Sequence, residues 1–162
     1  MIYCSSCGNK NIRTFIEGNY RYNCKNCLTI HYENPKPTST LICINNNKLL
    51  LGKRAFEPAI GQWGLIGGFM ELNETLFDSA ARELKEETNL NGTALKIIGT
   101  ASHFNSIFGD ILLIGILMEI KDWSNLEAAD DVSELQLFKF NELPNLAFDS
   151  HKHIVDLYLK NK

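Results

Sequence analysis

The chain has 162 residues, of which 44% are hydrophobic and 22% charged, with a formal net charge of −3 and a pI of about 5.8. This length and composition predict one ordinary soluble domain, with room for a small appendage. The net negative charge means that no overall positive field attracts the molecule to nucleic acid or anionic lipid. The longest apolar run, at 111–118, is too short to span a bilayer, and the N-terminus lacks the pattern of a signal peptide. We therefore expect a cytoplasmic protein with reduced cysteines.

Four of the five cysteines form two C-x2-C pairs, Cys4 with Cys7 and Cys24 with Cys27. Their spacing is typical of a site in which four thiolates surround Zn²⁺ tetrahedrally, and such a closed site would be structural. Two disulfides or a redox-active C-x-x-C are the alternatives, and a reducing compartment disfavours both. The fifth cysteine, Cys43, lies in an apolar stretch and is expected in the core.

Between the two pairs, β-prone residues flank Gly18-Asn19, which predicts a hairpin that turns there. A piece of about thirty residues cannot fold on apolar burial alone, so bound metal would supply the missing stability. We predict a small zinc ribbon over residues 1–34, a proline-containing linker over 31–39 and a second domain over 35–162.

The second domain is expected to begin with a strand hairpin that turns at 45–47, followed by an ordered loop rich in glycine and aromatic residues. That loop covers 56–74. A helix over 75–88 follows, with Thr75 and Asp78 in the capping-box arrangement and Asn89 suited to the left-handed position after its end. The remaining predicted elements are strands over 94–101, 110–120 and 135–140 and a terminal helix over 150–161.

The predicted helix carries Glu83, Glu86 and Glu87 close together, although like charges three or four residues apart cost a few tenths of a kcal/mol per pair. At about 100° per residue the three carboxylates fall within an arc of roughly 100°, and Glu87 borders the apolar stripe. A solvated, glutamate-rich surface helix is the alternative. A stripe built for stability alone would not place a carboxylate there, but for this helix in isolation the solvated alternative remains the default, and the surrounding sequence has to decide.

The spacing around this helix is specific. Gly68 is followed after five residues by Glu74, and after seven more by Arg82-Glu83-Leu84-Lys85-Glu86-Glu87. This resembles the Nudix box, G-x5-E-x7-R-E-U-x-E-E-x-G-U, in which U is a bulky aliphatic residue. Asn89 stands where the box has its last glycine, and asparagine tolerates the same left-handed conformation. The chain is identified on this resemblance as a Nudix hydrolase, a family that cleaves a nucleoside diphosphate linked to another group.

The resemblance extends to residues 34–38, 49–75 and 142–148, which are similar to Nudix proteins with an N-terminal zinc ribbon, the subgroup of plant FAD pyrophosphatase. It implies an α+β fold: a Nudix α/β/α sandwich with a mixed sheet, preceded by a four-cysteine ribbon. Ile66-Gly67 stand where the subgroup usually has Pro-Ala. The S-Q-P-W-P-F-P-x-S stretch of NADH pyrophosphatases is absent, which argues against NADH as the preferred substrate.

The resemblance also implies the catalytic groups. Mg²⁺ or Mn²⁺ would be bound by the box carboxylates and a nearby backbone carbonyl: Glu83, Glu86, Glu87 and Gly67 or Gly68. Such ions would neutralise the diphosphate and activate a water molecule. Arg82 would orient Glu74 and the metal ligands rather than bind phosphate.

Other site residues are less tightly specified by the sequence. The general base is either a box glutamate or a distant carboxylate, for which Glu134 is favoured over Asp130 and Asp131. Arg54 could meet the diphosphate. The candidates for contact with the base are Phe56, Trp63, Phe104 and Phe108, with His103 a weaker one. Stacking on an aromatic ring is worth about 1–3 kcal/mol per base, and core packing is the alternative for each ring.

The expected function is a metal-dependent pyrophosphatase that hydrolyses a nucleoside diphosphate derivative, of the FAD or ADP-ribose type, to AMP and a phosphorylated product. The alternatives are a triphosphate-cleaning Nudix enzyme and a non-catalytic module that recognises a nucleotide or protein. The expected partner is a small-molecule nucleotide, with no nucleic acid and no membrane, and a homodimer is left open.

Overall fold

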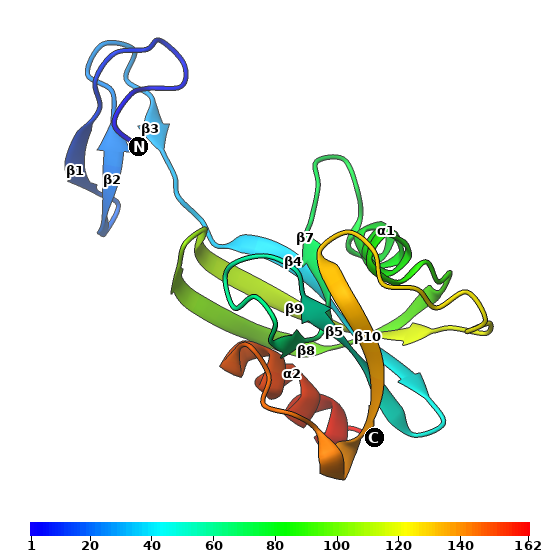
Figure 1. Ribbon diagram of the computed structural model, residues 1–162. Coiled ribbons are helices and arrows are strands. Elements are labelled where there is room, and N and C mark those ends of the chain that lie inside the picture. The colour runs from blue at the N-terminus through cyan, green and yellow to red at the C-terminus, as the bar shows by residue number, and fades with distance from the viewer. The chain divides into compact units, whose positions relative to one another are not determined.

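The computed structural model describes residues 1–162, which divide into two compact units, Met1–Asn34 and Pro35–Lys162 (Figure 1). Each unit has its own sheet. Neither helix of the chain has the length and apolar character needed to cross a bilayer.

The N-terminal unit is a three-stranded antiparallel sheet in the order β1-β2-β3. Its strands are β1 (Ile12–Ile16), β2 (Asn19–Asn23) and β3 (Ile30–His31). The predicted hairpin is present, but its turn lies one residue earlier than predicted, at Glu17 and Gly18, which have φ angles of 53° and 79°. A two-residue hairpin turn of this type needs positive φ at both central positions, which leaves Asn19 to begin β2.

This unit has almost no apolar core. Its only buried residues are Cys4, Asn11, Cys24 and His31. Larger apolar side chains such as Phe15 and Tyr20 are more than half exposed. Apolar burial is therefore too small to stabilise this unit, and the cysteine cluster is the feature that remains to hold its strands together.

The C-terminal unit is built on a mixed sheet in the order β10-β5-β4-β9-β8. Its long strands are β4 (Lys36–Asn45), β5 (Lys48–Arg54), β8 (Thr93–Ser106), β9 (Gly109–Glu119) and β10 (Val132–Lys139). β6 (Trp63–Gly64) pairs with β5, and β7 (Ile66–Phe69) pairs with β4. The β4–β9 pair is parallel and the others are antiparallel.

Two helices cover the two faces of this sheet, α1 (Leu76–Thr88) and α2 (Asp149–Lys160), and a short 3₁₀ turn (Phe140–Glu142) precedes α2 (Figure 1). Alternation along β4 decides which core each side chain enters: Leu41 and Cys43 pack with α1, whereas Ile42 packs with α2. β5 alternates in the same way. The predicted α+β sandwich with a mixed sheet is confirmed.

Helix α1 begins and ends as predicted. The Thr75 hydroxyl accepts a hydrogen bond from the Asp78 N–H, and the Asp78 carboxylate accepts one from the Thr75 N–H. Asn89 follows the helix with φ of 57°, and its N–H donates to the Lys85 carbonyl. These two caps fix the position of the glutamates relative to the sheet.

The predicted linker and loop boundaries were wrong. The strand β4 begins at Lys36, inside the predicted linker, because proline is tolerated near the start of a strand and the Pro37 carbonyl accepts a hydrogen bond from Met70. The predicted loop over 56–74 contains β6 and β7. Neither strand shows alternation in the sequence, since β7 includes two glycines and forms only by pairing with β4.

The strands predicted over 94–101 and 110–120 are joined more closely than expected. β8 runs to Ser106 and β9 starts at Gly109, so only Ile107 and Phe108 separate them. Three register shifts interrupt the β8–β9 ladder, and they obscure the alternation from which a longer strand could have been predicted.

Candidate active site

A cavity of about 500 Å³ in the C-terminal unit collects residues from many elements. Its acidic part comes from α1 and from the loop before β10: Glu83, Glu86, Glu87, Asp130 and Asp131. A second part carries hydrogen-bond donors and aromatic rings from the end of β5, from β8 and from the start of α2: Arg54, His103, Phe148, Ser150 and His151. The cavity therefore combines a set of carboxylates with a second set of residues that supplies positive charge and hydrogen-bond donors.

The α1 carboxylates differ in exposure. Glu83 and Glu87 are buried, at 8% and 7% exposed, whereas the Glu86 side chain is 45% exposed. Glu87 Oε2 accepts a hydrogen bond from the Gly67 N–H at 2.9 Å and has no cationic partner in the protein. Burial raises the pKa of Glu87 to about 8, and repulsion from Glu83 and Asp131 adds to the effect. Burial also raises the pKa of Glu83.

Arg82 is fully occupied by neighbours within the protein. Its Nε and Nη2 donate to Glu74 at 3.0 and 2.9 Å, and its Nη1 donates to Glu83 at 2.7 Å and to Glu86 at 2.8 Å. Its Nη2 also donates to the Phe69 carbonyl at 3.1 Å. The Arg82 guanidinium lowers the pKa of Glu74 to about 2. Since a guanidinium has five N–H donors, Arg82 has none left for a substrate.

Two glycines bring the β7 backbone close to the carboxylates. Gly67 has φ of 129°, a conformation that L side chains rarely adopt. A Cβ on Gly68 would lie 2.7 Å from Glu83 Oε1. Two buried carboxylates, a third at the rim and adjacent backbone form an all-oxygen donor set of the kind that hard divalent cations prefer. These residues fit the predicted metal site.

The structure does not place Glu134 at the cavity. Its carboxylate pairs with Lys53 across the β10–β5 ladder and is about half exposed. The register shift between Val132 and Glu134 separates this side chain from the loop that precedes the strand. Asp130 and Asp131, ranked lower from the sequence, are the acidic residues of this region that line the cavity.

The aromatic candidates divide in a similar way. His103 and Phe108 line the cavity, and Phe108 packs edge-on against Phe69 at 5.5 Å. Phe104 follows His103 on a strand, so it points to the other face, where it is exposed. The two remaining candidates also lie outside the cavity lining: Phe56 is exposed, and Trp63 packs against Phe138.

Three cavity residues at the start of α2 were not predicted: Phe148, Ser150 and His151. Phe148 contacts the rings of His103 and His151 edge-on, each at 5.2 Å, and the Arg54 guanidinium lies 5.4 Å from its ring centroid. The sequence signals them only weakly: Phe148 ends the stretch 142–148, which shares the Nudix resemblance, and Ser150 and His151 follow directly after it. Their proximity to the glutamates requires the folded sheet.

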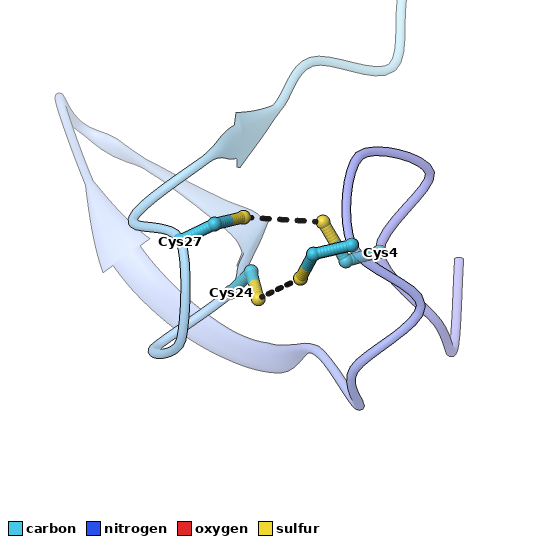
Figure 2. A group of neighbouring side chains, drawn as sticks. Cys4, Cys24 and Cys27 are labelled. Carbon is cyan, nitrogen blue, oxygen red and sulfur yellow. Dashed lines mark hydrogen bonds between the residues drawn. The ribbon is translucent and has the colours of Figure 1, made fainter.

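The N-terminal unit contains a second cluster. The sulfur atoms of the four paired cysteines lie within 4.8 Å of one another. Figure 2 shows Cys4 facing Cys27 and Cys24 facing the remaining cysteine, with sulfur–sulfur distances of 3.6 and 3.5 Å. These separations are far longer than a disulfide bond of about 2.05 Å, so all four thiols are free. Hydrogen bonds from Asn9 lower the pKa of Cys7 to about 6, whereas the pKa of its neighbour Cys24 is raised to about 11, chiefly by burial.

The surroundings of His151 predict a pH dependence of stability. Burial, together with the nearby charges of Arg54 and His103, lowers the pKa of His151 from 6.5 to about 3. The unfolded chain therefore binds a proton that the folded chain excludes, and this part of the stability is lost as the pH falls from 6.5 toward 3. In His151→Asn, chemical denaturation at about pH 8 and about pH 5 should show a smaller acid loss than in wild type. An equal loss in both proteins would contradict this assignment.

Comparisons with known proteins agree with this geometry. Residues 35–158 match the NUDIX domain family. The chain is 35% identical over 132 residues to a protein of Methanocaldococcus jannaschii named ADP-ribose pyrophosphatase, an alignment that covers 81% of this chain and 77% of that protein. It is 27% identical over 147 residues to the NAD-capped RNA hydrolase NudC of Vibrio atlanticus, covering 91% of this chain but 52% of the relative. The chain thus spans about half the length of that relative.

Among solved structures, a NUDIX hydrolase from Nitrosomonas europaea superposes with a TM-score of 0.86 at 33% identity, over 100% of this chain and 92% of that one. The similarity therefore includes the four-cysteine unit as well as the sheet and helices. With the box residues assembled around one cavity and a family match that covers most of the sequence, this chain belongs to the NUDIX family of hydrolases.

Proposed function

We propose that this protein is a divalent-metal-dependent pyrophosphatase that cleaves a nucleoside diphosphate derivative of the ADP-ribose or FAD type, releasing AMP and a phosphorylated product. The observation that carries the proposal is the convergence of Glu83, Glu86 and Glu87 on a cavity that also contains Arg54. The relative named ADP-ribose pyrophosphatase supports this substrate class.

In this proposal Glu83, Glu86 and Glu87 hold Mg²⁺ or Mn²⁺, with a backbone oxygen of Gly67 or Gly68. When bound, such ions supply charge neutralisation for the diphosphate and activation of a water nucleophile. Arg82 positions Glu83 and Glu86 through the hydrogen bonds described above, and Glu74 fixes Arg82 in turn.

The remaining roles concern the proton and the nucleotide. Asp130 and Asp131 are the distant carboxylates that line the cavity, and we propose one of them as the group that takes the proton from water. Arg54 would contact the diphosphate. His103 and Phe108 would contact one of the two organic groups attached to it.

Product analysis tests this function directly. The protein is incubated with Mg²⁺ or Mn²⁺ and, separately, with ADP-ribose, FAD, NADH and dGTP. We expect AMP from ADP-ribose or FAD. Pyrophosphate from dGTP alone would instead support triphosphate cleaning. Failure to turn over any of the four, in protein that binds the metal, would favour the recognition-module alternative.

Glu87→Gln should reduce kcat by about two orders of magnitude or more, because it removes a metal ligand while preserving shape. The fold should persist or become slightly more stable without metal, since the variant no longer buries a carboxylate that lacks a cationic partner. Glu119→Gln, the same change at an exposed position, serves as the control. Turnover near the wild-type rate in Glu87→Gln would refute the ligand role.

We further propose that the four paired cysteines hold a structural Zn²⁺. Their four sulfur donors match its preferred ligand set, and the unit has too little apolar core to fold without it.

Removal of this ion should unfold residues 1–34 selectively. We expect a strong chelator, or Cys24→Ser, to make this segment sensitive to protease while the NUDIX unit keeps its melting transition. Cys43→Ala is the matched control, because Cys43 is buried in the core of the NUDIX unit and should lower that transition instead. An N-terminal segment that stays protease-resistant after complete metal removal would show that the ion is not required.

A further inference from the structure

The cavity residues at the start of α2 have hydrogen-bonding capacity that the protein itself does not use. In His151, Nδ1 accepts a hydrogen bond from the Leu65 N–H at 2.9 Å. An accepting nitrogen carries no proton, so in the neutral ring the proton is on Nε2. No acceptor within the protein contacts Nε2, and the ring lines the cavity.

The position of the His151 ring is closely defined. A Cβ on Gly64 would approach His151 Nδ1 to 3.2 Å, so the glycine leaves the space in which the ring sits. Phe148 contacts the ring edge-on from the same segment of chain. With the ring held on two sides and anchored to Leu65, the direction of its free N–H is fixed.

Ser150 provides a second unused donor. The residue is 6% exposed, it lines the cavity, and its hydroxyl has no hydrogen-bond partner. Buried hydroxyls are normally paired, so an unpaired one beside a cavity is a candidate donor to a bound ligand. Ser150 also lies in the first turn of the 12-residue helix α2, whose N-cap residue Phe148 contributes no side-chain hydrogen bond. The positive end of this helix is therefore left uncapped by any side chain.

Arg54 supplies the positive charge. Its Nε donates to the Pro58 carbonyl at 2.6 Å, whereas its two terminal nitrogens have no acceptor in the protein. The contrast with Arg82 is direct, since every N–H of Arg82 is used by Glu74, Glu83, Glu86 or the Phe69 backbone. Of the two arginines that line the cavity, Arg54 is therefore the one with N–H groups available to bind an anion.

We propose that His151, Ser150 and Arg54 form a phosphoryl-binding subsite, which holds the phosphate of the substrate that is not placed on the α1 glutamates. The inference rests on the proposed diphosphate function and adds to it the group that grips the second phosphate. All three side chains present donors, and one is cationic, which suits oxygens that only accept and carry charge.

Two substitutions separate this role from a structural one. In His151→Asn the side-chain oxygen can replace Nδ1 as the acceptor for Leu65, while the donor toward the cavity is lost. Ser150→Ala removes a hydroxyl that has no partner in the protein, so the fold should be unaffected. Each should raise KM for ADP-ribose and FAD about tenfold, with kcat changed less, as expected for the loss of one hydrogen bond to a charged group.

The matched control is His153→Asn, the same change on the exposed side of α2, which should leave KM unaltered. Unchanged KM in both His151→Asn and Ser150→Ala would overturn the proposal. So would a KM increase confined to one substrate, since that pattern would mean that the subsite binds the organic group and not a phosphate common to all.

A binding measurement that does not depend on turnover distinguishes this proposal from the proposed function. Inorganic phosphate is titrated into metal-free protein with a chelator present, and the His151 ring nitrogens are followed by NMR. We expect the Nε2 chemical shift to change saturably with phosphate. Ser150→Ala should raise the phosphate concentration at half-saturation about tenfold. A His151 signal that phosphate leaves unchanged would overturn the subsite. A shift in protein that hydrolyses no nucleoside diphosphate derivative would retain the subsite and reject the function.

Discussion

The Gly67 N–H donates to Glu87 at 2.9 Å, and this contact joins helix α1 to the backbone of β7 at the point where both line the cavity. Around it the protein accepts an arrangement that costs stability: Glu83 and Glu87 are both buried, and burial raises the pKa of each. Arg82 offsets part of the charge through Glu83 but does not reach Glu87. A carboxylate kept in this state without a cationic partner is a feature of a functional site, not of a helix selected for stability.

The mixed sheet explains why such distant segments meet. Because side chains alternate along β4 and β5, the sheet supports α1 on one face and α2 on the other with two separate cores. The cavity receives the glutamates from α1 and Phe148, Ser150 and His151 from the start of α2. One fold therefore places carboxylates and hydrogen-bond donors around a single cavity, which is the combination that metal-assisted cleavage of a diphosphate requires.

The four-cysteine unit follows a different principle. Its strands bury little beyond Cys4, Cys24 and two polar residues, so apolar packing does not account for their arrangement, and the cysteine cluster is consistent with a zinc ribbon. The cysteine cluster was predictable because the spacing within and between the two C-x2-C pairs is local in sequence. The same holds for the caps of α1, where Thr75, Asp78 and Asn89 act within a few residues of the helix ends.

The sequence by itself determined the box of glutamates, the cysteine cluster, the caps of α1 and the sandwich class, because each depends on residue type at short, fixed spacing. Only the tertiary structure decided that Glu134 pairs with Lys53 outside the cavity and that His151 faces into it. A register shift in β10 directs Glu134 away from the cavity. The His151 ring is oriented by the hydrogen bond that its Nδ1 accepts from Leu65, a residue 86 positions away in the sequence. The glycine-rich strand β7 likewise exists only through its pairing with β4, since glycines leave no alternation to read. Contacts between residues so far apart in the sequence leave no local sequence pattern, so only the folded structure reveals them.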